Sequence, residues 1–303
     1  MFLKDRKEPM DLRKMRSLRP RMSWSEKDEI YYWTLQKGFE GELQFDRLME
    51  QNLSRNKLIV NDLLLQHNQT YFQIDTLMFL QGSLYLFEVK NFEGDYYVEE
   101  DRWYSFDGKK IKNPLHQLER CNVLLQGLLR DIGFKNIPIK PYLIFINPQF
   151  SLYQAPLNHP FVFPTQLHRL MIQLNNLASI PTEKNRKFLN RLVGLHIHDS
   201  PFTNVPAYSF KQLEKRMTCM KCNHFVVPFN EKMVICQNCG NVESLQSAVL
   251  RSVEEFKTLF PDLKITTNSM FEWTGEIWPK KRLHRILFEN YNNKGYGRFS
   301  YYE

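Results

Sequence analysis

The chain has 303 residues, of which 43% are hydrophobic and 14% aromatic, so it can build about two packed domains, and global disorder is excluded. Its net charge of +8 and pI of about 9.1 favour a polyanionic partner such as nucleic acid or a membrane surface. It has no apolar run of about 18 residues, and its basic start lacks an apolar signal core. We therefore expect neither a transmembrane helix nor secretion.

The chain begins with a basic segment, followed by a predicted helix. Residues 1–24 contain eight Lys and Arg against three Asp and Glu, typical either of an arm that touches phosphates or of an ordinary solvated terminus. Residues 24–50 have a helical pattern that includes GFEGE at residues 38–42 and an apolar stripe. Glu42 therefore lies in the first turns of a packed helix, where an acid usually complements the helix dipole.

Residues 71–91, YFQIDTLMFLQGSLYLFEVKN, form the central pattern of the chain. Two apolar runs of strand length flank Gln81-Gly82, which is predicted to be a tight hairpin turn. A two-residue loop places Asp75 opposite Glu88, and the strand period of two puts Lys90 on the same face. Facing carboxylates repel each other unless a cation such as Mg²⁺ lies between them. The alternatives are a solvated strand edge and a three-residue loop that shifts the pairing.

The segments around this hairpin predict an α/β sheet. Apolar runs at residues 57–65 and 94–111 indicate further strands. Asn113-Pro114 begins a helix, with Asn as the N-cap, and Gln117 lies in its first turn. The nearly all-apolar residues 138–146 indicate a strand covered on both faces. This order implies a sheet flanked by helices, with its chemistry at one edge.

Two CxxC pairs are the strongest local signal in the chain. Cys219 and Cys222 are separated by thirteen residues from Cys236 and Cys239, a spacing typical of zinc ribbons in which four thiolates surround Zn²⁺. Four protein ligands leave no open position, so this zinc is expected to be structural. A redox CxxC is the alternative, but it does not explain two pairs. The fifth cysteine, Cys121, is expected to be a core thiol.

The C-terminal part is predicted to be helical and basic. Residues 247–260 form an amphipathic helix, and beyond them come a short helix, a turn at Gly275 and a second helix begun by Pro279. A basic second helix after such a turn is what a helix-turn-helix DNA reader needs, although an ordinary αα-hairpin is the alternative. The predicted nucleic-acid contacts are Lys280, Lys281, Arg282 and Arg285.

Four motifs occur in an order that resembles a known family. GFEGE, then QID at residues 73–75, LFEVKN at residues 86–91 and NPLHQ at residues 113–117 resemble the NERD family, the nuclease-related domain. That family is similar to the restriction-endonuclease-like PD-(D/E)xK fold. The resemblance covers roughly residues 37–148, and the zinc ribbon and basic C-terminal region fit NERD proteins with appended modules.

The resemblance implies a role for each matching residue. Asp75 and Glu88 would coordinate Mg²⁺ or Mn²⁺, and Glu42 would complete or orient the metal shell. Lys90 would orient or deprotonate the attacking water, or offset charge on the phosphate. Gln117 would hydrogen-bond the phosphate or an outer water. The implied reaction is metal-dependent hydrolysis of a phosphodiester.

The sequence thus predicts a restriction-endonuclease-like mixed sheet flanked by helices, followed by a small zinc ribbon and a helix-turn-helix-like module. The expected parts are an N-terminal arm (1–35), a nuclease-like domain (36–150), a connector packed on it (151–212), a zinc ribbon (213–245) and a basic helical module (246–303). We expect a bacterial-like, cytoplasmic nuclease that needs Mg²⁺ or Mn²⁺, contains structural Zn²⁺ and acts on DNA rather than RNA or a membrane. The alternatives are a catalytically silent nucleic-acid-binding or scaffold protein and a regulatory protein without a nucleic-acid role.

Overall fold

The computed structural model describes residues 2–54, 56–177, 181–198 and 200–303. The chain forms two compact units. One comprises Met1–Lys7 and Leu35–Phe202, and the other Glu8–Thr34 and Thr203–Glu303. Among the described residues, no helix is both long and apolar enough to cross a membrane.

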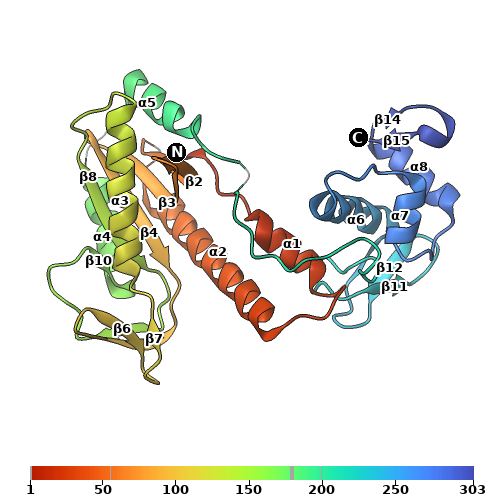
Figure 1. Cartoon of the computed structure of the whole chain (residues 1–303), viewed down its shortest axis with the longest axis horizontal. Coiled ribbons are helices and arrows are strands. Elements are labelled where there is room, and N and C mark those ends of the chain that lie inside the picture. Colours follow the sequence, from red (N-terminus) through yellow and green to blue (C-terminus); the bar gives the residue numbers. More distant parts are fainter. Residues whose placement is uncertain (1, 55, 178–180, 199) are drawn as a thin grey trace. The chain divides into compact units, whose positions relative to one another are not determined.

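A six-stranded mixed sheet forms the centre of the first unit, in the order β1-β2-β3-β4-β8-β10 (Figure 1). Strands β2, β3 and β4 are antiparallel, whereas β1, β8 and β10 each pair in parallel with a neighbour. The strands are β1 (Phe2–Lys4), β2 (Leu58–His67), β3 (Thr70–Leu80), β4 (Ser83–Lys90), β8 (Ile139–Phe145) and β10 (Phe161–Val162). A smaller sheet has the order β7-β6-β5-β9 and contains β5 (Gly94–Glu99), β6 (Arg102–Ser105), β7 (Lys110–Ile111) and β9 (Phe150–Tyr153).

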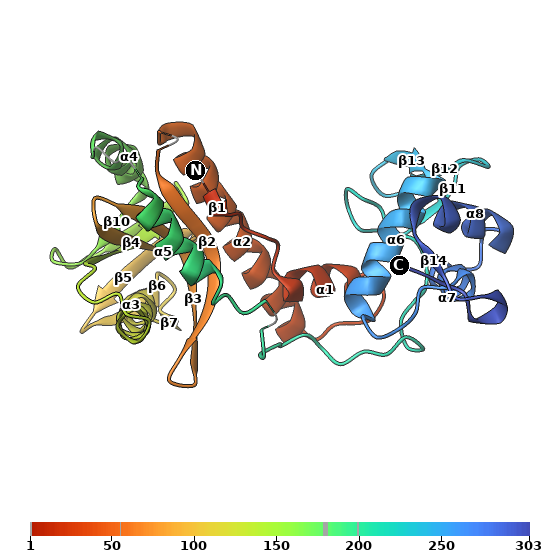
Figure 2. The same cartoon turned by 90° about the horizontal axis from the view of Figure 1, so that it is seen from above.

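Helices cover both faces of the six-stranded sheet (Figures 1 and 2). One core contains side chains of α3 (Pro114–Asp131) and α5 (Glu183–Val193). The other contains side chains of α2 (Glu26–Asn52) and α4 (Leu167–Asn176), which follows the short 3₁₀ helix η1 (Pro164–Gln166). Strand β4 alternates between them, because Leu86 faces the α3 core and Phe87 the α2 core. The predicted mixed α/β fold is confirmed.

The hairpin between β3 and β4 has the predicted register. Leu80 pairs with Ser83 and the ladder continues to Thr76 and Phe87. The loop is Gln81-Gly82, and both of its residues have positive φ, 51° and 74°, as type I′ turns require. The β3–β4 ladder ends at Thr76, while β3 still pairs with β2 and β4 with β8. The two strands therefore part from each other immediately before Asp75 and after Phe87.

The second unit combines helices with a three-stranded antiparallel sheet, β11-β12-β13. Its elements are α1 (Met10–Leu18), β11 (Val226–Pro228), β12 (Met233–Cys236), β13 (Val242–Ser244), α6 (Leu245–Leu259), α7 (Thr267–Trp273), α8 (Lys280–Asn290), β14 (Asn293–Lys294), η2 (Gly297–Phe299) and β15 (Tyr301–Tyr302). Helix α6 contributes to two cores, one shared with the three-stranded sheet and one with α7. The four-cysteine segment with its small sheet is consistent with the predicted zinc ribbon.

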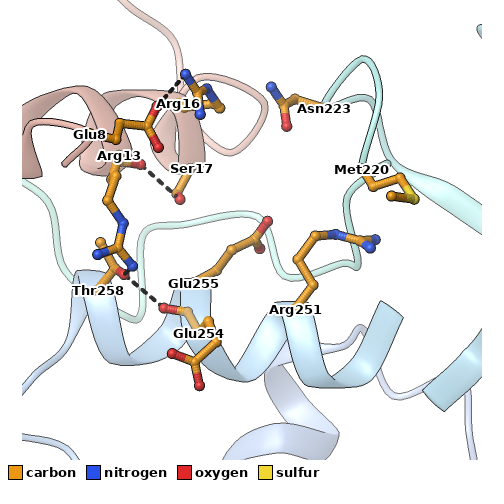
Figure 3. A pocket seen from close by; sticks show the side chains of 10 residues that line it. All are labelled: Glu8, Arg13, Arg16, Ser17, Met220, Asn223, Arg251, Glu254, Glu255 and Thr258. Atoms are coloured by element: carbon orange, nitrogen blue, oxygen red, sulfur yellow. Dashed lines mark hydrogen bonds and ion pairs between the residues drawn. The ribbon is translucent and has the colours of Figure 1, made fainter. Parts of the chain in front are cut away.

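Much of the positive charge in the N-terminal segment is engaged inside the second unit. The Arg21 side chain is fully buried, donates to Glu255 at 2.7 Å and lies 4.0 Å above the Trp273 ring. On α1, Arg13 donates to Thr258 Oγ1 on α6 at 2.9 Å (Figure 3). These arginines serve the packing of α1 and its neighbours.

Candidate active site and zinc site

Asp75, Glu88 and Lys90 lie where β3 and β4 stop pairing. Glu88 and Lys90 have the strand parity of Leu84 and Leu86, which face α3. The alternation along β3 changes between Ile74 and Leu77, both of which face α3, so parity alone does not place Asp75. The charges of Asp75 and Glu88 both act on the Cys121 thiol of α3. The Asp75 Oδ2 atom accepts a hydrogen bond from the Val89 backbone N–H at 2.8 Å. The carboxylate thus satisfies a backbone donor that the ladder no longer pairs.

Lys90 connects the end of β4 to the first turn of α3. Its Nζ donates to Glu88 Oε1 at 2.7 Å and to Gln117 Oε1 at 3.0 Å. Gln117 is in reach because α3 begins where predicted, with the Asn113 side chain accepting from the Leu115 N–H. The structure therefore brings Glu88, Lys90 and Gln117 into direct contact.

Glu42 comes from α2, on the other face of the sheet. The residue before it, Gly41, lies so close to the end of β4 that an added Cβ would be 2.5 Å from Asn91 Cβ. Only glycine permits this approach, and the approach carries Glu42 to the end of the sheet. Glu42 is near enough to Asp75 for the two charges to influence each other.

Arg6 is a site residue that the sequence reasoning missed. Its guanidinium donates to Glu42 Oε2 at 2.6 Å and to both Asp46 oxygens at 2.8 and 3.1 Å. It also donates to the Asp75 carbonyl at 2.9 Å and to Thr76 Oγ1 at 3.1 Å. These partners are 36 to 70 residues away in sequence, so no local pattern indicates them. The available signal was Asp46 itself, four residues after Glu42, because two acids on one helical face call for a cation.

The site carries more negative than positive charge. Burial, reinforced by the charge of Asp75, raises the pKa of Glu42 and of Glu88 to about 8, and burial also raises the pKa of Asp75. Burial alone would lower the pKa of Lys90, but Glu88 and Asp75 outweigh it, and the net pKa is raised. The cations Arg6 and Lys90 face four carboxylates, those of Glu42, Asp46, Asp75 and Glu88.

Oxygen donors with this excess of negative charge fit a hard divalent cation. Asp75 and Glu88 are the two carboxylates whose charges act on the Cys121 thiol of α3. In the described part of the chain, they do not join Glu42 in a group of ligand atoms that all lie within 4.8 Å of one another. The carboxylates of Glu42, Asp75 and Glu88 are thus neighbours at the end of the sheet without converging on one point.

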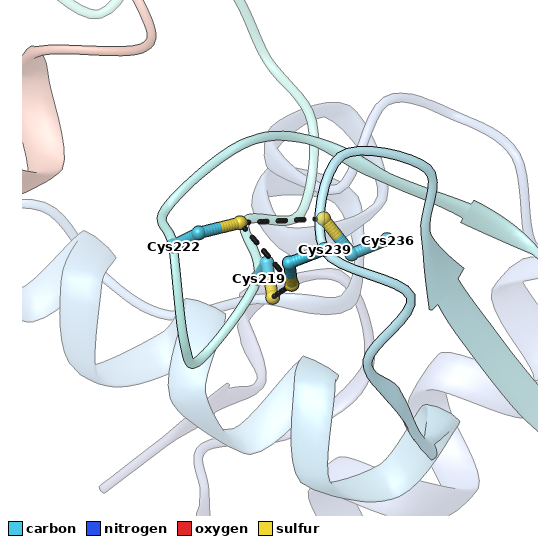
Figure 4. A group of neighbouring side chains, drawn as sticks. All are labelled: Cys219, Cys222, Cys236 and Cys239. Carbon is cyan, nitrogen blue, oxygen red and sulfur yellow. Dashed lines mark hydrogen bonds between the residues drawn. The ribbon is translucent and has the colours of Figure 1, made fainter.

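The four cysteines of the second unit do form such a group, with all four sulfurs within 4.8 Å of one another (Figure 4). The Sγ–Sγ distance is 3.4 Å from Cys222 to both Cys236 and Cys239, and 3.7 Å from Cys219 to Cys239. Tetrahedral zinc with Zn–S bonds of about 2.3 Å separates its sulfurs by about 3.8 Å. The cluster can therefore hold zinc. Cys121 is buried in α3, and burial raises the pKa of its thiol, as expected of a core residue.

The four basic residues predicted to contact nucleic acid fall into two pairs. Lys280 and Arg282 are each hydrogen-bonded to another residue of the second unit. Lys281 and Arg285 are exposed, and the Arg285 side chain retains 75% of its accessible surface while it forms a solvent-exposed ion pair with Glu289, one turn further along α8. Helices α7 and α8 are joined by a turn at Gly275, whose φ of +87° favours glycine.

Comparison with known families finds a match within the first unit. The model of the nuclease-related domain, NERD, matches residues 37–146. Searches of curated proteins and of solved structures found no match. The matched range contains Glu42, Asp75, Glu88, Lys90 and Gln117, but neither Arg6 nor the cysteine cluster. The chain therefore contains a nuclease-related domain at residues 37–146 and, outside it, a four-cysteine cluster that can hold zinc.

Proposed function

We propose that this protein is a metal-dependent, nuclease-like enzyme that hydrolyses phosphodiester bonds in DNA. The observation that supports it most is the group of Asp75, Glu88 and Lys90 where β3 and β4 part, within the nuclease-related domain. A scaffold protein has no need for buried like charges that destabilise its fold. We place the protein in a reducing compartment such as the cytoplasm, because the clustered cysteines must stay thiolates to hold zinc.

In this proposal Asp75 and Glu88 hold Mg²⁺ or Mn²⁺ through carboxylate oxygens, and Glu42 completes or orients the metal shell. When bound, the cation supplies Lewis acidity and lowers the pKa of its water. Glu88 and Gln117 fix the Lys90 ammonium beside the two carboxylates. Held there, Lys90 can orient the attacking water or offset charge that builds on the phosphate.

The test compares wild type with Asp75→Asn on plasmid DNA, single-stranded DNA and RNA, with and without Mg²⁺ or Mn²⁺. Asparagine keeps an oxygen that can accept the Val89 N–H, so the fold should survive. We expect metal-dependent cleavage of DNA by the wild type and a loss of about 1,000-fold in the variant, because several kcal/mol of transition-state stabilisation depend on the cation. Equal cleavage by both proteins would indicate a contaminating nuclease. Salt-dependent binding without cleavage by either would favour the silent scaffold.

We infer that the exposed face of α8 contacts nucleic-acid phosphates in this function. Lys281 and Arg285 are four residues apart, so they lie on one face of α8. Replacing both with alanine should lower the slope of log K against log salt by about 1.8 for duplex DNA, since each phosphate contact contributes about 0.9. The matched control replaces Lys280 and Arg282, which are engaged within the unit, and should change the slope less. Unchanged binding by the Lys281/Arg285 variant would exclude this face as the contact.

A further inference from the structure

Arg6 lies 31 residues before the start of the matched domain, yet its side chain is enclosed by residues of that domain. We propose that Arg6 is a positioning residue of the active site, which holds Glu42 in the orientation that cation binding by Asp75 and Glu88 requires. The proposal rests on the proposed function in that it takes these two carboxylates as the metal-binding pair. It gives the first seven residues, which lie outside the family match, a part in cation binding.

The N-terminal strand delivers Arg6 to this position. Strand β1 pairs in parallel with β2, with Phe2 beside Ile59 and Lys4 beside Val60. The Lys4 ammonium donates to the backbone carbonyls of Asn61 and Asp62, which anchors the strand at the sheet edge. Two residues later, the Arg6 side chain enters the site and retains only 1% of its accessible surface. A group so enclosed cannot be a substrate contact, so its role must act through its partners.

The contacts of Arg6 join α2 and β3, which carry Glu42, Asp46 and Asp75. The Nε and Nη2 atoms form a two-pronged pair with the Asp46 carboxylate, which fixes the plane of the guanidinium. This leaves Nη1 to hold Glu42 at 2.6 Å, while Nη2 also reaches the Asp75 carbonyl and Thr76 Oγ1. Helix α2 is thereby linked to β3 at the residue where β3 parts from β4. A lysine, with one nitrogen, cannot reproduce this set of bonds.

Two roles for this arginine predict opposite effects on cation binding. If Arg6 only neutralises charge, its removal uncovers one more negative charge and strengthens the binding of a divalent cation. If Arg6 orients Glu42, its removal frees Glu42 to turn away from Asp75, which repels it, and cation binding weakens. Residues that orient metal-binding groups typically contribute 10- to 100-fold to metal affinity. The several bonds that hold the guanidinium in one plane favour the second role.

The experiment measures Mn²⁺ binding to the full chain by electron paramagnetic resonance, with Asp75→Asn giving the level of binding outside the site. We expect Arg6→Met and Glu42→Gln each to weaken Mn²⁺ affinity by about 10- to 100-fold, and the double variant to be no weaker than the weaker single one. Arg6→Lys, which keeps the charge but not the geometry, should recover little. Lys7→Met is the control, because it removes the same charge from an exposed neighbour.

Tighter Mn²⁺ binding by Arg6→Met, full rescue by lysine, or losses that multiply in the double variant would overturn the positioning role. If Arg6→Met does not fold, Asp46→Asn replaces it, since this change loosens the anchor of the guanidinium and should weaken Mn²⁺ binding in the same direction. Unchanged binding by Asp46→Asn would then count against the proposal. A wild type that binds no more Mn²⁺ than Asp75→Asn would instead refute the metal site itself, and with it the proposed function.

Discussion

Replacing Glu88 with glutamine is expected to abolish cleavage and, at the same time, to stabilise the metal-free protein above pH 7. The Glu88 carboxylate is needed to bind the cation. In the metal-free fold, however, only 3% of the Glu88 side chain is exposed to water, so its ionised form is a buried charge. Glutamine keeps the shape and can still accept from Lys90 through its carbonyl oxygen. The charge of Glu88 that cation binding needs therefore lowers the stability of the metal-free fold.

The dependence on pH follows from the raised pKa of Glu88, about 8 in the metal-free fold against 4.5 for a glutamate side chain in water. Between these two values the unfolded chain has released the proton and the folded chain retains it, so stability falls as the pH rises through this window. Above about pH 8 both states are ionised and the loss is complete. The glutamine variant has no such loss at this position, so its advantage grows from pH 5 to pH 9 and is on the order of a few kcal/mol.

Thermal unfolding of the metal-free proteins in chelator, from pH 5 to pH 9, checks this prediction. The advantage of Glu88→Gln should appear as an increasing difference in Tm, about 2–4 °C for each kcal/mol. Glu99→Gln is the control, because Glu99 is exposed and its replacement removes the same charge from the same unit. Parallel Tm curves for wild type and Glu88→Gln would contradict the prediction. They would show that ionising Glu88 does not destabilise the metal-free fold.

Removal of zinc is expected to unfold the core of the second unit while leaving the first unit folded. Cys219 and Cys236 are buried in one core with side chains of the small sheet, α6 and α8. Zinc contributes about 10–16 kcal/mol to the folding of zinc-finger peptides, so its loss should destabilise the core that contains these cysteines. Without it, α8 should lose the support that holds Lys281 and Arg285 on its surface, and nucleic-acid binding should weaken.

Cys236→Ser should lose one equivalent of zinc, measured by metal analysis of the purified protein. Its calorimetric scan should show a transition lowered by more than about 10 °C, and a second transition, that of the first unit, in its original place. Cys121→Ser is the matched control, because it removes a buried thiol outside the cluster and should retain the zinc. Full zinc content in Cys236→Ser would contradict a four-cysteine site.

Several features depend on neighbours in the sequence, and these could be predicted. The register of the β3–β4 hairpin follows from the two-residue turn, so Asp75 and Glu88 could be placed near each other, one residue beyond the last ladder pair. The start of α3 follows from an Asn-Pro cap, which places Gln117 near Lys90. The two CxxC turns likewise predict that their sulfurs converge. In each case the determining residues lie within a few positions of one another.

What the tertiary structure decided involves residues that no local pattern connects. The entry of Arg6 into the site depends on the pairing of β1 with β2, more than fifty residues later in the chain. The hydrogen bonds of Lys280 to Asn268 and of Arg282 to Glu231 likewise depend on the packing of the second unit. A turn, a cap or a strand period is set by the covalent geometry of adjacent residues. An ion pair between distant segments forms only when the whole unit has packed, so the sequence alone determined the register of the hairpin, and the fold decided which cation holds Glu42.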